Sequence, residues 1–139
     1  MTATPSTFWD DLTQDLQDPE FLRDYVRESI RIATIDQLVS ALDAAREAAH
    51  LSKAELARAI GAEPAVVRRL FSAGHVNPTL GTLAEVAAAL GMRVTLEALP
   101  AEERARVTQP LLEGRSADPK ALAEHVTAMR QRPGRVLAS

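Results

Sequence analysis

The sequence predicts an all-α protein with one short β-strand that follows its main helical domain in the chain. Hydrophobic residues make up 46% of the chain, and most of them recur at helical spacing. Several of these apolar stripes begin at a capping signature, and two of them end at Gly61 and Gly91. Residues 93–98 differ, because apolar and polar side chains alternate there as in a half-buried strand.

Size and composition restrict the classes of protein that fit. A chain of 139 residues fits one domain with a modest core, together with tails. It has no cysteine, which excludes disulfides and thiolate metal sites. The first thirty residues lack the apolar run of a secretion signal, and no later stretch approaches the roughly 20 apolar residues that span a bilayer. We therefore expect a soluble, cytoplasmic protein.

The first part, residues 1–33, is expected to form an N-terminal helical extension. Asp18, Pro19 and Glu20 form a helix start, so one helix should end before them and another should follow. The first helix has an apolar stripe of Phe8, Trp9, Leu12 and Leu16. The second has Phe21, Leu22, Tyr25 and Val26 on one face.

Residues 34–91 are expected to form a separate helical domain. Thr34 and Gln37 have the spacing of a capping box and should begin a helix of about four turns. Ser52 and Glu55 repeat this spacing at the start of a shorter helix, which Gly61 should end.

Three further elements are expected on the C-terminal side of Gly61. Pro64 is tolerated as the first residue of a helix that runs to about Ser72. Thr79 should cap the next helix, which ends at Gly91. The predicted strand then occupies residues 92–100 and needs a partner strand or chain, since a single strand is not stable alone. Residues 101–139 are predicted to form a linker and then a C-terminal helix from Asp118, or a flexible tail.

The stretch around Gly61 has the composition of two helices that cross at a tight turn. Such a pair needs a small residue where the helices touch, which Ala57 supplies, and branched apolar anchors in the second helix, which Val67 and Leu70 supply. With "LSKAELARAIG", "VVRRL" and "NPTLGTLAEVAAALG", residues 35–91 resemble the Xre/Cro-type helix-turn-helix family. The resemblance implies five short helices around one core and a DNA-binding transcriptional repressor.

The resemblance also implies which residues contact operator DNA. Lys53 and the helix start at Ser52 correspond to phosphate contacts, and the helix from Pro64 lies in the major groove. An arginine can donate two hydrogen bonds to guanine, so Arg68 and Arg69 are the expected base-reading residues. The full predicted DNA-binding set is Ser52, Lys53, Glu63, Pro64, Ala65, Arg68, Arg69, Ser72 and His75.

An alternative for the two arginines is a solvated surface position, or ion pairs with Glu63 and Glu55. Glu63 and Pro64 also depart from the family, which often has Ser or Thr and then Gln at these positions. The net charge of −3 is unusual for a DNA-binding protein, but seven acidic residues against two arginines lie within residues 1–30. Lys53, Arg58, Arg68 and Arg69 against Glu55 and Glu63 leave a local excess of two positive charges.

The flanks of the domain carry a second resemblance. "DPEFLRDYVRES" and "RVTLEAL" resemble segments of HigBA-type antitoxins, which repress their own operon and bind a small RNA-cleaving toxin. The alternative is a stand-alone regulator. A homodimer is expected on DNA, and the predicted dimer or partner contacts are Phe8, Trp9, Leu12, Leu16, Phe21, Tyr25, Val94 and Leu96. The N-terminal stripe could instead cover the core of its own domain.

No enzymatic pattern is visible in the sequence. His50, His75 and His125 are scattered, and HExxH, GxSxG and glycine-rich phosphate-loop motifs are absent. The N-terminal aspartates lack the spacing of a calcium loop. We expect no catalytic residues, no cofactor and no metal site, and a protein-interaction module that has lost DNA binding is the third possibility.

Overall fold

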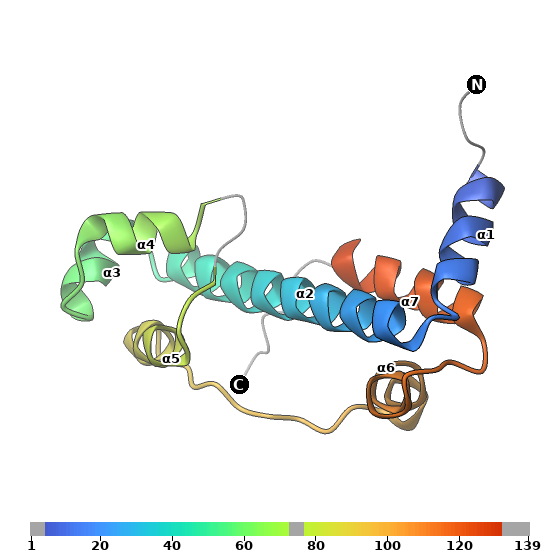
Figure 1. Ribbon diagram of the computed structural model, residues 1–139. Coiled ribbons are helices and arrows are strands. Elements are labelled where there is room, and N and C mark those ends of the chain that lie inside the picture. The colour runs from blue at the N-terminus through green and yellow to red at the C-terminus, as the bar shows by residue number, and fades with distance from the viewer. Residues whose placement is uncertain (1–4, 73–76, 132–139) are drawn as a thin grey trace. The chain divides into compact units, whose positions relative to one another are not determined.

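The computed structural model describes residues 5–72 and 77–131, and within these ranges its only regular secondary structure is α-helix (Figure 1). Its seven helices are α1 (Pro5–Asp15), α2 (Pro19–Ala48), α3 (Lys53–Ala59), α4 (Pro64–Leu70), α5 (Leu80–Ala89), α6 (Ala101–Glu113) and α7 (Pro119–Gln131). In the described ranges, none of these helices combines the length and the apolar character that crossing a membrane requires. The all-α prediction is confirmed for the helices and is wrong for the strand.

The chain divides into two compact units. Unit 1 comprises residues 5–33 and 97–131 of the described chain, and unit 2 comprises residues 34–72 and 77–96. The long helix α2 supplies its first half to unit 1 and its second half to unit 2.

Unit 1 is built from α1, the beginning of α2, α6 and α7 around its own core. Core 1 contains Leu12, Leu16, Leu22, Val26, Val107, Leu122, Ala123 and Val126, with Trp9 and Tyr25 packed against it. Two arginines tie its helices together. Arg23 donates from Nε and Nη2 to the carbonyl oxygens of Leu111 and Leu112, both at 3.1 Å, and Arg130 donates to the buried Ser29 hydroxyl at 2.8 Å.

Unit 2 is built from the end of α2, α3, α4 and α5. Core 2 contains Leu42, Leu56, Ala57, Val67, Leu70, Leu83, Val86 and Ala87. Each of the three short helices buries two or three residues on one side, so their other sides face solvent. These four elements replace the expected arrangement of five short helices.

The predicted helix start at Thr34 is wrong, because α2 runs through this position without a break. The helix begins instead at the predicted earlier site, where Asp18 Oδ1 accepts a hydrogen bond from the Glu20 N–H at 3.0 Å. After Pro19 the helix contains neither glycine nor proline, so nothing ends it before Ala48. The Thr34–Gln37 spacing therefore lies inside a helix, where it has no capping role.

The predicted strand at residues 92–100 is also wrong, since this segment has no regular secondary structure. Val94 is half-buried against core 2, but Leu96 is 101% exposed and Ala98 is exposed as well. A strand requires a neighbour with which to form backbone hydrogen bonds, and the described chain provides none.

The expected C-terminal helix is present, and a second helix precedes it. Helix α7 begins after Asp118, whose Oδ1 accepts from the Ala121 N–H at 3.1 Å. Helix α6 lies in the region predicted as linker and contains Pro110 in its last turn. Gly114 ends α6 in the left-handed conformation, with φ of 73°, and its N–H donates to the Pro110 carbonyl at 2.7 Å.

Candidate nucleic-acid interface

The start of α3 is fixed by a reciprocal capping box. Ser52 Oγ accepts from the Glu55 N–H at 3.0 Å, and Glu55 Oε1 accepts from the Ser52 N–H at 3.1 Å. The hydrogen bond from the Ser52 backbone and then that from its side chain lower the pKa of Glu55, and the charge of Arg58 adds to the effect. This carboxylate is therefore held in its charged form by the helix start itself.

The turn between α3 and α4 closes through Gly61. Its φ is 66°, its N–H donates to the Arg58 carbonyl at 3.2 Å, and the Ala62 N–H donates to the Ala57 carbonyl at 2.9 Å. This pair of bonds is a Schellman motif, in which glycine adopts the left-handed conformation at least cost. The chain then enters α4 at Pro64.

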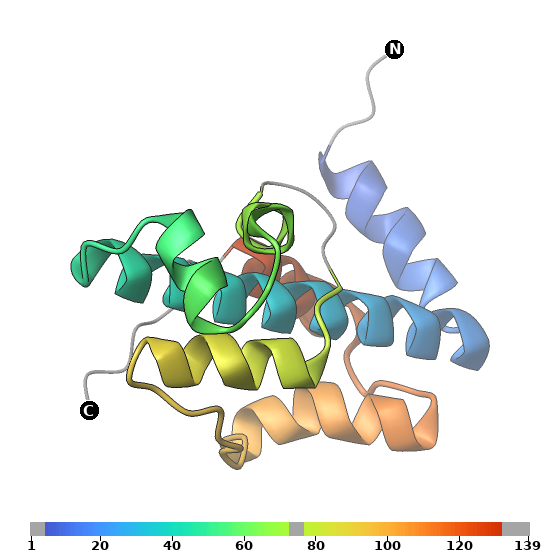
Figure 2. The same cartoon turned by 90° about the vertical axis from the view of Figure 1, so that its left-hand side faces the viewer.

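Helices α3 and α4 pack against each other with their axes far from parallel (Figure 2, where α4 is seen nearly end-on). Ala57 of α3 and Val67 of α4 are both 0% exposed, and Leu70 is 4% exposed. The exposed residues of helix α4 include Pro64, Ala65, Arg68 and Arg69. The predicted inward and outward sides of α4 are therefore those of the structure.

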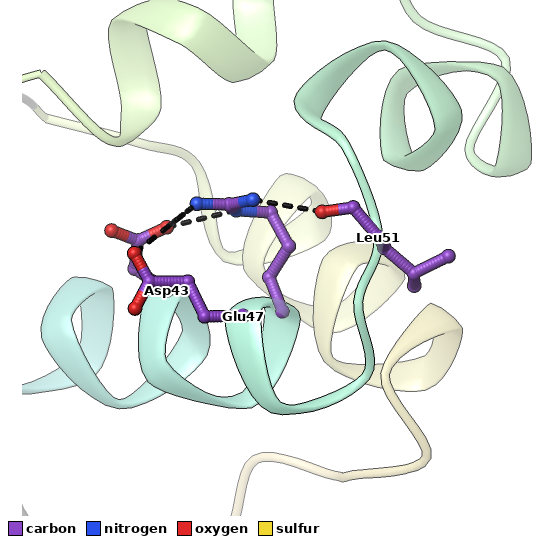
Figure 3. Close-up of polar contacts among 4 residues, drawn as sticks. Asp43, Glu47 and Leu51 are labelled. Carbon is purple, nitrogen blue, oxygen red and sulfur yellow. Dashed lines mark hydrogen bonds and ion pairs between the residues drawn. The ribbon is translucent and has the colours of Figure 1, made fainter.

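Arg46 holds the two helices in place from α2, a role that the sequence reading missed. Its guanidinium contacts Asp43 Oδ1 through Nε at 2.9 Å and Nη2 at 2.8 Å, and it donates from Nη1 to the Leu51 carbonyl at 2.8 Å. Figure 3 shows Asp43, Glu47 and Leu51 around this group, and Glu47 lies 3.7 Å from Nη2. The guanidinium also lies 5.7 Å from the centre of the Phe71 ring.

Leu51 precedes α3 and Phe71 follows α4, so Arg46 connects both ends of the helix pair to α2. The local spacing of Asp43 and Arg46 could have indicated an ion pair on one helix. The contacts with Leu51 and Phe71 depend on the tertiary fold and leave no local signal.

The exposed side of α4 carries two uncompensated positive charges. Within the described ranges, neither Arg68 nor Arg69 forms an ion pair. Glu55 is engaged with the capping box, and Glu63 makes no side-chain hydrogen bond to the start of α4. Ser72 Oγ donates to the Arg69 carbonyl at 2.8 Å. Lys53 is half-buried at the first position of α3.

The other residues singled out in the sequence lie in different places. His75 lies outside the described residues. His50 follows α2 in the left-handed conformation, with φ of 57°, and His125 is buried in unit 1. No cluster of histidine, aspartate and glutamate that could hold a metal ion occurs in residues 5–72 and 77–131.

The predicted partner contacts divide between buried and exposed positions. Leu12 and Leu16 belong to core 1, whereas Phe8 is 57% exposed. Phe21 is 38% exposed and stacks on Tyr25, with 6.1 Å between the ring centres.

Comparison with known proteins supports the interpretation of this helix pair. Residues 42–96, which include α3, α4 and α5, match the family model described as "Helix-turn-helix". Neither the curated proteins nor the solved structures gave a match. The family match supports a DNA-binding transcription regulator of the Xre/Cro type.

Proposed function

We propose that this protein is a sequence-specific transcriptional repressor in which the exposed side of α4 contacts bases in the major groove of operator DNA. The observation that carries the proposal is the pair Arg68 and Arg69. Both are exposed and unpaired within the described chain, on a helix anchored by the buried Val67 and Leu70. This helix lies in the segment that matches the helix-turn-helix model.

The residues around the arginines suggest how the site divides its work. A guanidinium donates two parallel hydrogen bonds to O6 and N7 of guanine, so Arg68 or Arg69 supplies base discrimination. Ala65 offers an apolar contact for a thymine methyl group, and Glu63 can accept from the amino group of cytosine. Lys53 and the α3 start at Ser52 are suited to phosphate, which positions the helix without reading sequence.

The test begins by selecting a binding site for the purified protein from a library of random DNA duplexes. Arg68→Ala and Arg69→Ala should each weaken binding to the selected site by about 1–3 kcal/mol. Both variant proteins should still bind random DNA nearly as well as the parent protein does. Lys53→Ala should weaken binding to both DNAs and reduce the salt dependence. Arg27→Ala removes an exposed arginine of unit 1 and is the matched control. If both α4 variants bind the selected site as well as the parent does, α4 is not the helix that contacts the bases.

We further propose that the repressor binds as a homodimer. One α4 of seven residues contacts few base pairs, whereas two copies about a two-fold axis reach successive major grooves roughly 34 Å apart. The selected site should therefore be an inverted repeat. A selected site without two-fold symmetry would contradict the dimer.

A second candidate function is that of an antitoxin with a small basic toxin as partner. It is supported by Phe8 and Phe21, which are exposed on unit 1 beside the acidic residues of α1 and early α2. Co-expression with the product of the neighbouring open reading frame tests it. Phe8→Lys with Phe21→Lys should abolish co-purification, and Leu112→Lys, at another exposed leucine of unit 1, should not. If no protein co-purifies with the parent, the stand-alone regulator is the better description.

A further inference from the structure

We propose that two copies of this chain associate through residues 93–97 about a two-fold axis beside Thr95, so that Leu96 of each copy enters an apolar pocket of the other. The inference rests on the proposed dimeric repressor and specifies its contact. Three features of unit 2 and the residue that follows it carry the inference: a small pocket, an exposed leucine and a self-complementary pair of charges.

The pocket lies in unit 2 beside the extended segment. It has a volume of about 160 Å³, and its walls include Leu38, Leu42, Leu83 and Val94. An apolar cavity of about 150 Å³ is large enough for a benzene molecule, so this one can take one leucine side chain. Arg93 and Thr95 also line it.

Leu96 is the side chain that fits this description. It is 101% exposed, the highest value among the exposed large hydrophobic residues of the described chain. Leu96 lies two positions after Val94, whose side chain packs against core 2, and its own side chain is fully exposed to solvent. Leu96 directly follows the lining residues Arg93, Val94 and Thr95 in the chain and makes no contribution to core 2 of its own chain.

Charge decides which partner and which register fit. A two-fold axis at Thr95 places position 93 of one antiparallel copy opposite position 97 of the other, and position 94 opposite position 96. Arg93 then faces Glu97 twice, and Val94 faces Leu96 twice. Neither Arg93 nor Glu97 forms an ion pair within residues 5–72 and 77–131.

Neighbouring registers lose this match. An axis at Leu96 would place Arg93 opposite Leu99, and an axis between Val94 and Thr95 would place it opposite Leu96. Of these three axes, only the one at Thr95 places unlike charges opposite each other and apolar side chains opposite each other. The segment is thus complementary to itself, which favours a second copy over an unrelated protein.

The first test measures self-association by sedimentation velocity in the absence of DNA. Leu96→Lys should weaken the dimer by about tenfold or more, whereas the matched control Leu112→Lys should leave it unchanged. Arg93→Glu and Glu97→Arg alone each place like charges in contact and should weaken the dimer to a similar extent. The double variant exchanges the two charges and should restore parent-like association. Failure of the double variant to restore it, or a monomeric parent, would overturn the inference.

The second test uses a cysteine on the proposed axis. Because the natural chain has no cysteine, Thr95→Cys introduces a single thiol per copy, and the axis brings the two thiols together. Mild oxidation should convert Thr95→Cys to a covalent dimer much faster than Ala54→Cys, an exposed position on α3. Equal rates would place the axis elsewhere.

The outcome of these tests is independent of DNA binding. The double variant Arg93→Glu with Glu97→Arg could restore the dimer while Arg68→Ala and Arg69→Ala leave DNA binding unchanged. This result would support the dimer contact and contradict the proposed function. If the parent binds DNA through the arginines but sediments as a monomer, or associates only with a different protein, the dimer contact falls.

Discussion

His50 is the one non-glycine residue with positive φ in the described chain. Three helices of unit 2 end in the same way, α2 at His50, α3 at Gly61 and α5 at Gly91. At His50 the residue's own N–H donates to the Glu47 carbonyl at 3.0 Å and the next N–H donates to the Arg46 carbonyl at 3.2 Å. These are the two bonds of a Schellman motif, with a side chain at the position that favours glycine.

We predict that His50→Gly stabilises the protein by about 1 kcal/mol, because glycine relieves the left-handed strain and leaves the motif intact. The free energy of unfolding in urea, followed by far-UV circular dichroism, measures the effect. Gly61→Ala is the converse control. A β-carbon at Gly61 meets no atom within 4 Å, so backbone strain alone should cost about 1 kcal/mol. Equal stability of His50→Gly and the parent would mean that the imidazole makes a compensating contact.

The lowered pKa of Glu55 gives the start of α3 a defined pH dependence. A carboxylate whose pKa is lower in the folded protein stabilises the fold above its ordinary pKa of 4.5, and this contribution is lost as the pH falls further. Glu55→Gln keeps the capping geometry without the charge. Its stability should be lower than that of the parent at neutral pH, and the difference should shrink below pH 4.5. A difference that is constant with pH in urea titrations would contradict this origin.

At the scale of elements, the sequence predicted the helices whose ends carry local signals. Ser52 with Glu55, Pro64, Thr79 and Asp118 all mark observed helix starts. The same kind of signal at Thr34 was misleading, because capping spacing is meaningful only where a helix actually begins.

Helix α6 was not predicted because Gly114, Ser116 and Pro119 are typical of a linker, whereas the last carbonyl groups of α6 accept hydrogen bonds from Arg23, in a distant part of the chain. The segment at 92–100 alternates like a strand but has no pairing partner in the described chain. Within the candidate site, the buried and exposed sides of α4 follow from helical periodicity. The role of Arg46 does not, since its contacts with Leu51 and Phe71 join residues that only the tertiary fold brings together.

We predict that Arg46→Met destabilises the protein by about 1–3 kcal/mol. Methionine retains an apolar stem of similar length but leaves Asp43 and the Leu51 carbonyl without their charged donor. The Arg46 side chain is only 13% exposed, so solvent screens these bonds weakly. Arg31→Met is the matched control, since the Arg31–Glu28 pair is more than half exposed and should contribute less than about 0.5 kcal/mol. If the two variants lose a similar free energy of unfolding in urea, Arg46 contributes no more than an exposed ion pair.

At the scale of the whole molecule, the described chain has two hydrophobic cores that share no residue. Leu22 of core 1 and Leu56 of core 2 are both 0% exposed. Truncation of either to alanine should cost about 2–5 kcal/mol, through lost burial and a residual cavity. Amide hydrogen exchange should show that Leu22→Ala lowers protection mainly in α7 and Leu56→Ala mainly in α5. Equal loss of protection in both helices for both variants would show that the two units unfold as one.

The position of Trp9 has a consequence for how such experiments are observed. Trp9 and Tyr25, the single tryptophan and the single tyrosine of the chain, both pack against core 1, and Phe71 is the one aromatic residue of the three types in unit 2. Intrinsic fluorescence therefore reports on unit 1 and is nearly silent for the helix-turn-helix. A tryptophan placed at the exposed Leu80, the first residue of α5, would give unit 2 its own fluorophore, so that quenching by DNA and unfolding of each unit could be followed separately.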